Sequence, residues 1–266
     1  MENYEQYFRA NQLLWNQRTV VHRDSSFYDL AGFKKGGSCL TPIELNEMGD
    51  VNGKKLLHLQ CHFGMDTLDW ARRGAQVTGV DLSDKAIDEA KTLAEELKLT
   101  AAFICCNVYD LEKYLHGQFD IVFTSYGVVG WLPDLDKWAA LIARYLKPGG
   151  IFYLAEFHPV VWMFDDDFTH IKYFYDNHEL IITENQGTYT DRNAAIQGKE
   201  YSWNHSLSEV INALVKAGLQ LQSFNEYMYS PYPCFGNMVE TEKGHWQIKG
   251  MEGKIPMVYS IRAIRS

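Results

Sequence analysis

The feature that most constrains the fold is an alternation of strand-like and helix-like segments over residues 54–157. Five short runs rich in aliphatic and aromatic residues are separated by amphipathic helical patterns. Each run is apolar along its length, which is typical of strands buried on both faces in a parallel sheet. The sequence therefore predicts an α/β fold, with a doubly wound, mostly parallel sheet and helices on both faces. The predicted strands are residues 55–60, 76–81, 101–107, 119–125 and 151–157.

The alternation of predicted strands and helices divides the chain into three parts. Residues 1–50 carry aromatic and aliphatic residues at helical spacing, and we expect them to form a helical lead-in or lid. Residues 51–157 and 204–266 form the predicted core. Residues 158–203 break the rhythm and are interpreted as a small β insertion that forms part of a substrate pocket.

Two details of the less regular segments are also predicted. Within the insertion, residues 170–176 and 179–190 are expected to pair as antiparallel strands around a turn at Asn177 and His178. Residues 230–256 are expected to form a long loop, and long loops are often functional.

Charge and composition narrow the classes of partner. A net charge of −9 disfavours nucleic acid and anionic membrane surfaces, and no apolar run approaches the length of a membrane span. The five cysteines show no C-x-x-C spacing, and the acidic run at residues 165–167 is interpreted as a solvated turn, so we expect no metal site. We expect a cytoplasmic monomer or homodimer that acts on a small molecule.

Polar residues stand where the first four predicted strands end. The ends are Gln60–Gly64, Asp81, Asn107 and Ser125–Tyr126. Ligands of open parallel sheets bind beyond the carboxyl ends of the strands, so these residues are expected to border one crevice. Asp81 ends an apolar strand, and a carboxylate there can accept both hydroxyls of a ribose.

The first of these turns selects among adenosine cofactors. A dinucleotide needs bare backbone from a G-x-G-x-x-G turn, but Gln60 and His62 place side chains there, and no G-x-x-x-x-G-K-[ST] motif is present. An adenosine cofactor without phosphate fits better. S-adenosylmethionine has a zwitterionic tail that polar side chains such as Gln60 and His62 can meet.

Five ordered segments resemble the successive motifs of class I S-adenosylmethionine-dependent methyltransferases, in a small-molecule branch with a variant Q-C-H-F-G first motif. They are LLHLQCHFGMD, VTGVDLSDKAIDEAK, FICCNVYDL, FDIVFTS and ARYLKPGGIFYLAE. The resemblance covers about residues 52–157 and 204–264. It implies a Rossmann-like, seven-stranded sheet whose last strand is antiparallel, with S-adenosyl-L-homocysteine as product. His58 departs from the family's usual acid, and Asn107 from its common aspartate.

The resemblance also assigns cofactor roles to ten residues: Gln60, Cys61, His62 and Gly64 at the amino-acid moiety, Asp81 at the ribose, Leu82, Asn107 and Val108 at the adenine, and Ser125 and Tyr126 near the methionine end.

The sequence says less about the residues that would contact the methyl acceptor. An in-line displacement mainly needs alignment, and a general base helps only where the acceptor must lose a proton. Two alternatives stay open: an NAD-dependent oxidoreductase, which Asp81 permits, and a non-catalytic S-adenosylmethionine-binding protein, which the altered turn permits. Candidate catalytic residues at the end of the fifth strand are Glu156 and His158, and candidate substrate contacts are Trp15, Tyr28, Trp203 and His205.

Overall fold

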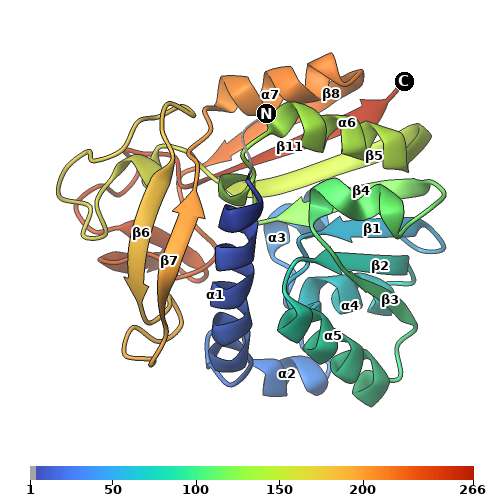
Figure 1. The fold of residues 1–266 in the computed structure, drawn as a ribbon, viewed down its shortest axis with the longest axis horizontal. Coiled ribbons are helices and arrows are strands. Elements are labelled where there is room, and N and C mark those ends of the chain that lie inside the picture. Colours follow the sequence, from blue (N-terminus) through green and yellow to red (C-terminus); the bar gives the residue numbers. More distant parts are fainter. Residues whose placement is uncertain (1–3) are drawn as a thin grey trace.

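A seven-stranded sheet organises the computed structural model, which describes residues 4–266 (Figure 1). The strand order is β3-β2-β1-β4-β5-β11-β8. Strand β11 runs antiparallel to both of its neighbours, whereas β1 to β5 run parallel, as predicted. The strands are β1 (Lys55–Leu59), β2 (Gln76–Asp81), β3 (Ala101–Cys105), β4 (Phe119–Ser125), β5 (Leu146–Phe157), β8 (Leu219–Tyr227) and β11 (Val258–Arg265).

Both faces of the sheet are buried, because successive side chains of each strand enter different clusters. In β1, Leu57 and Leu59 pack with residues of α6 (Leu135–Tyr145) and α7 (Leu207–Lys216). Leu56, which precedes them, packs on the opposite face with Trp70 of α4 (Met65–Arg72). This arrangement explains why the strands are apolar at every position rather than at alternate ones.

Helix termini in the core follow local capping rules. Ser83 accepts a hydrogen bond from the Ala86 N–H at the start of α5 (Asp84–Leu97). Thr41 and Glu44 form a capping box at the start of α3 (Pro42–Met48). Helix α6 ends at Tyr145 and the chain enters β5 directly at Leu146. Residues 147–150 therefore belong to β5 and not to an extension of α6.

The N-terminal part contains the helices α1 (Glu5–Arg23) and α2 (Leu30–Lys34) before α3. Figure 1 shows α1, in blue, between the strands β6 and β7 on one side and the sheet on the other. Residues 1–3 of the predicted lead-in lie outside the described residues.

The insertion pairs differently from the prediction. Strand β6 (Ile181–Gln186) pairs antiparallel with β7 (Gln197–Ser202), and residues 170–176 form only an isolated bridge through Ile171. The predicted pairing was wrong because the hairpin is closed by turns over residues 187–196, where Gly187 has φ 71°. Short 3₁₀ turns precede it in the chain: η1 (Val108–Lys113), η2 (Val129–Trp131) and η3 (Val161–Met163).

Residues 230–256 also hold more structure than predicted. They contain the two-stranded hairpin of β9 (Met238–Glu242) and β10 (His245–Ile248). Gly244, with φ 75°, lies in the turn and accepts a left-handed backbone without a side-chain penalty. The expectation of a continuous loop was therefore wrong for this part.

Candidate active site

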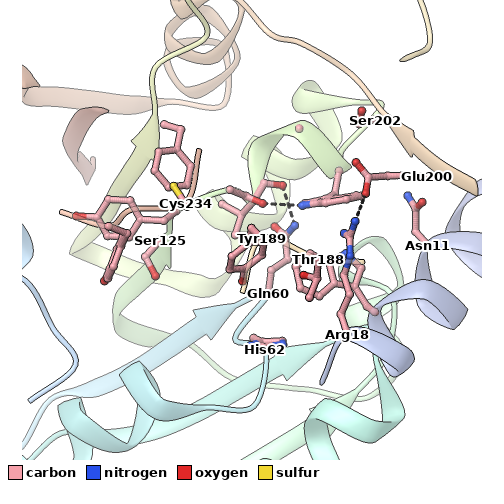
Figure 2. Close-up of a pocket in the computed structure, with 18 of the residues that line it drawn as sticks. Asn11, Arg18, Gln60, His62, Ser125, Thr188, Tyr189, Glu200, Ser202 and Cys234 are labelled. Carbon is pink, nitrogen blue, oxygen red and sulfur yellow. Dashed lines mark hydrogen bonds and ion pairs between the residues drawn. The ribbon is translucent and has the colours of Figure 1, made fainter. Parts of the chain in front are cut away.

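A cavity of about 760 Å³ lies at the carboxyl ends of the strands, lined also by residues of α1 and the β6–β7 hairpin (Figure 2). This volume is in the range of small-molecule pockets. Ten residues that the sequence assigned to a cofactor line this one cavity, although they come from four strand ends. They are Gln60, Cys61, His62, Gly64, Asp81, Leu82, Asn107, Val108, Ser125 and Tyr126.

The turn after β1 keeps the backbone of a glycine-rich turn with other residues. Gln60 and His62 have φ 57° and 51°, and Gly64 has φ 78°. A Cβ on Gly64 would lie 2.8 Å from the Phe103 ring, so this position has no room for a side chain. The left-handed backbone costs about 1–2 kcal/mol at a residue other than glycine. The turn therefore retains its shape at some energetic cost while gaining two polar side chains.

Those two side chains have unused hydrogen-bonding capacity. Gln60 Nε2 donates to the Val128 carbonyl at 2.9 Å, whereas Gln60 Oε1 is buried without a partner among the described residues. His62 Nε2 is likewise buried without a partner there. Burial lowers the pKa of His62 to about 3, with a smaller contribution from Arg18, so its imidazole is neutral. Buried polar atoms of this kind normally find a partner, which makes them candidate ligand contacts.

Asp81 links the turn to the next helix. Its carboxylate accepts the His62 N–H and the Ser83 N–H, each at 2.8 Å. Burial raises the pKa of Asp81 to about 6 despite these bonds. Each carboxylate oxygen can accept a further hydrogen bond, so the group can hold the turn and still meet a ligand hydroxyl.

Asn107 is partly committed to the backbone. Its side-chain oxygen accepts the Tyr109 N–H at 3.1 Å and caps the turn η1. One lone pair of the oxygen that we expected to pair with adenine is therefore already in use.

Aromatic residues of α1 and of the segment between α1 and α2 cover the turn. The ring centroid of His62 lies 5.4 Å from that of Trp15 and 5.5 Å from that of Tyr28. The hydroxyls of Tyr28 and Tyr189 are hydrogen-bonded to each other. Trp15, Tyr28 and Trp203, three of the four expected substrate contacts, line the cavity, and Tyr189 joins them from the insertion.

Glu156, His158 and His205 do not line the cavity, so the lining gives no support to their predicted roles toward substrate, which stay predictions. The register pairs Ser125 with Ala155, so the Glu156 side chain meets the loop that follows β4. Its carboxylate accepts the N–H groups of residues 127–129 and of Phe157. Four backbone N–H groups therefore engage this carboxylate and fix the loop.

The two histidines have structural partners as well. His158 contacts Glu226 at 3.0 Å and accepts the Val160 N–H at 3.2 Å. His205 Nε2 lies 2.7 Å from the Leu132 carbonyl. Burial lowers the pKa of both imidazoles, although Glu226 and the Leu132 carbonyl oppose this effect.

Some cavity residues were missed at the sequence level. Asp66, in the first turn of α4, lines the cavity and accepts the Ser125 hydroxyl at 3.1 Å. An acid in a first helical turn is ordinarily explained by the helix dipole, so its position carried no distinct signal. Tyr232, from the predicted loop, also lines the cavity and contacts Tyr126 with ring centroids 5.1 Å apart.

Two kinds of feature are absent from residues 4–266. No group of three or more metal-ligating side chains is gathered in a way that could hold a metal ion. None of the helices in this range combines the length and apolar character needed to cross a bilayer.

Part of the chain is similar to known methyltransferases. Residues 57–154 match the model of the methyltransferase domain family. An uncharacterised methyltransferase from Synechocystis is 37% identical over 124 residues, which cover 46% of this chain and 56% of that protein. A ubiquinone biosynthesis O-methyltransferase from Alkalilimnicola ehrlichii is 30% identical over 146 residues, or 53% of this chain and 59% of that one. The chain thus spans somewhat more than half the length of these curated relatives.

Solved structures show the same fold. A putative S-adenosylmethionine-dependent methyltransferase from Listeria monocytogenes has a TM-score of 0.60 at 22% identity, covering 84% of this chain and 96% of its own. A geranyl diphosphate C-methyltransferase from Streptomyces coelicolor has a TM-score of 0.55 at 17% identity, covering 84% and 78%. At these identities the likeness establishes the architecture.

Proposed function

We propose that the chain is a class I S-adenosylmethionine-dependent methyltransferase, with its methyltransferase domain at residues 57–154, and that it methylates a small-molecule acceptor. The observation that carries this proposal is the convergence of four strand ends on one cavity. These strand ends hold Gln60–Gly64, Asp81, Asn107 and Ser125, the positions at which the family motifs would bind the cofactor.

The cavity residues fit S-adenosylmethionine. Asp81 would accept hydrogen bonds from the ribose hydroxyls, and the apolar side chains of Leu82 and Val108 would pack on the adenine. Gln60 Oε1 and His62 Nε2, which have no partner among the described residues, would meet polar groups of the tail. When bound, S-adenosylmethionine supplies an electrophilic methyl group on a sulfonium.

The protein's own contribution would be alignment and exclusion of water. Holding two reactants in reacting geometry can lower a barrier by about 7–11 kcal/mol in favourable cases. Glu156 supports this role indirectly, since it fixes the backbone next to Ser125 and Tyr126. Trp15 and Trp131, whose ring centroids are 5.4 Å apart, close the cavity on the side of α1.

Aromatic walls and net charge support a small acceptor. Trp131, Tyr189, Trp203 and Tyr232 line the cavity, as is common in pockets for small organic ligands. A net charge of −9 does not favour a nucleic-acid acceptor. The curated relative that methylates in ubiquinone biosynthesis supports the same class of acceptor. A cytoplasmic location and a monomeric or homodimeric state remain predictions.

Calorimetry with S-adenosylhomocysteine tests the proposal. We expect saturable binding, and Asp81→Ala should weaken it by roughly 1–3 kcal/mol because hydrogen bonds to the ribose are lost. Asp88→Ala, at an exposed position of α5, is the matched control. If the native protein does not bind S-adenosylhomocysteine at high micromolar concentration, the proposal is wrong.

Further outcomes separate the alternatives. Saturable enhancement of NADH fluorescence without S-adenosylhomocysteine binding would favour an oxidoreductase, against which the side chains of Gln60 and His62 in the turn argue. Tight cofactor binding without methylation of any compound in a broad metabolite screen would favour a non-catalytic binding protein.

A further inference from the structure

A carboxylate without a cation faces the cavity beside the turn after β1. Asp66 lines the cavity, accepts the Ser125 hydroxyl at 3.1 Å and lies beside the Cys39 thiol. The charged group that acts on it most directly is Asp69, which carries the same sign. Among residues 4–266, no lysine, arginine or histidine forms an ion pair with Asp66.

A buried carboxylate without a cation destabilises the folded protein unless a ligand supplies a hydrogen-bond donor or a positive charge. Burial raises the pKa of Asp66 to about 6, so at neutral pH the side chain is mainly charged in a poorly hydrated place. Buried charges are normally paired. Gln60 and His62, which line the same cavity, each have a buried polar atom without a partner among the described residues. These independent observations both indicate a polar ligand that spans this region.

Asp66 and Asp81 flank the turn on opposite sides. Both carboxylates raise the pKa of the Cys61 thiol, which lies in the turn between them. Asp81 ends β2, whereas Asp66 is bonded to Ser125 at the end of β4. A ligand with its ribose at Asp81 that extends across the turn toward β4 therefore brings its far end to Asp66.

The usual acid of the first strand is not available for this role. His58 stands at that position, and it is buried and hydrogen-bonded to Thr67 at 2.8 Å. Burial lowers the pKa of His58 to about 3, so the side chain is neutral and cannot supply a negative charge.

We propose that Asp66, supplied by helix α4 rather than by β1, binds the ammonium group of the amino-acid tail of S-adenosylmethionine. This inference rests on the proposed function. An amine-bearing acceptor would offer the same chemistry to Asp66, and the experiment below separates the two sources.

The test compares ligands that differ only in the tail. Asp66→Asn removes the charge but keeps an oxygen that can accept from Ser125. The probes are S-adenosylhomocysteine, its decarboxylated analogue, which retains the amine, and 5′-methylthioadenosine, which lacks the whole tail. We expect Asp66→Asn to weaken the first two by about tenfold or more and the third by less than about twofold, as loss of a charge-assisted hydrogen bond implies. Asp167→Asn, at an exposed position, controls for net charge.

The outcomes are distinct. Equal weakening of all three probes, or of none, would overturn the inference. Unchanged binding of S-adenosylhomocysteine with a raised KM for an amine acceptor would assign the ammonium to the acceptor instead. Failure of the native protein to bind both S-adenosylhomocysteine and 5′-methylthioadenosine would count against the proposed function rather than against Asp66.

A measurement on the native protein covers the case in which Asp66→Asn does not fold. The ratio of affinities for S-adenosylhomocysteine and 5′-methylthioadenosine should fall as the pH falls through about 6, because a protonated Asp66 no longer attracts an ammonium. The effect of Asp81 protonation on affinity cancels in this ratio, because both ligands would contact Asp81. A ratio that stays flat between pH 7.5 and 5 would overturn the inference. The titratable groups that act on or around Asp66 are Tyr28, Cys39, Glu44, Cys61, Asp69 and Tyr232.

Discussion

Helices α6 and α1 are attached to the molecule in opposite ways. Helix α6 buries Trp138, Ala139 and Ile142 completely against the sheet. Helix α1 buries Leu14, but its other buried residues are polar: Asn11, Arg18, Thr19 and His22. Helix α6 is held by apolar burial, which needs no particular geometry. Helix α1 depends more on directed hydrogen bonds and on ion pairs such as those of Arg18 with Glu200 and Arg23 with Glu89. Water can replace such polar contacts when they open, so we expect them to hold α1 less firmly than apolar burial holds α6.

The polar contacts of α1 reach both sides of the cavity. Gln12 Nε2 donates to the Leu82 carbonyl at 2.8 Å, next to the predicted ribose site. Asn11 exchanges two hydrogen bonds with the backbone of Tyr201 in β7, at 2.7 and 2.9 Å. Arg18 is paired with Glu200 in the same strand. These attachments suit a cover over a ligand cavity, which remains a proposal for α1.

The largest expected effect tests the apolar side of this comparison. Trp138→Ala should lower the free energy of unfolding by about 3–5 kcal/mol, because a fully buried ring is removed and leaves a cavity under α6. Denaturant unfolding measures the change. Tyr114→Ala, at a side chain that is 59% exposed, is the control and should cost less than about 0.5 kcal/mol. Similar losses in both variants would contradict the assignment of α6 to the core.

The second prediction concerns His58, a polar side chain that is buried in the mostly apolar strand β1. The pKa of His58 is lowered to about 3 by burial, so below pH 6.5 the unfolded chain binds a proton there that the native protein does not. Above pH 6.5 neither state is protonated at His58 and this linkage has no effect, whereas below pH 6.5 the free energy of unfolding falls as the pH falls toward 3. It declines by up to about 1.4 kcal/mol per pH unit.

His58→Gln removes this titration. The difference in unfolding free energy between the native protein and the variant should therefore shrink by up to about 2 kcal/mol from pH 6.5 to pH 5. Urea unfolding at several pH values measures it, with the exposed His116→Gln as control. A difference that is constant over this range would show that His58 titrates normally.

The smallest effect tests the polar side. Arg18→Met should destabilise the attachment of α1 by about 1–2 kcal/mol, since the side chains of Arg18 and Glu200 are only 8% and 18% exposed. Amide exchange should accelerate by about 5- to 30-fold in α1 and stay unchanged in β1 and β4. Arg9→Met, exposed on the same helix, is the control. Equal acceleration in the sheet would mean that α1 and the core open as one unit.

The sequence predicted the sheet well because burial on both faces leaves a local signal. The apolar runs of β1 to β5 were found within one or two residues at most ends, except where β5 begins earlier, at Leu146. The pairing of β6 was not predictable in the same way, since its partner β7 begins beyond the ten-residue connection of residues 187–196. Register in such an exposed hairpin is set by turn geometry more than by hydrophobic pattern.

In the candidate site, too, the sequence predicted some features and not others. Asp81 and Asn107 were predictable because a strand end in a parallel sheet fixes where a residue lies. Glu156 was also correctly placed at a strand end, but the register between β4 and β5 turned its carboxylate to four backbone N–H groups. The side-chain direction, which decides whether an acid meets a ligand, depends on that register and not on the residue type.

By itself, the sequence determined the α/β sheet, the order of its strand ends and the set of residues that meet there, because these follow from periodicity over short stretches. Only the tertiary structure decided which side chains meet one another over the cavity. Tyr28 meets Tyr189 across 161 positions of the chain, and Arg18 meets Glu200 across 182. Such contacts depend on how whole elements pack, and no local pattern of polar or apolar residues records them.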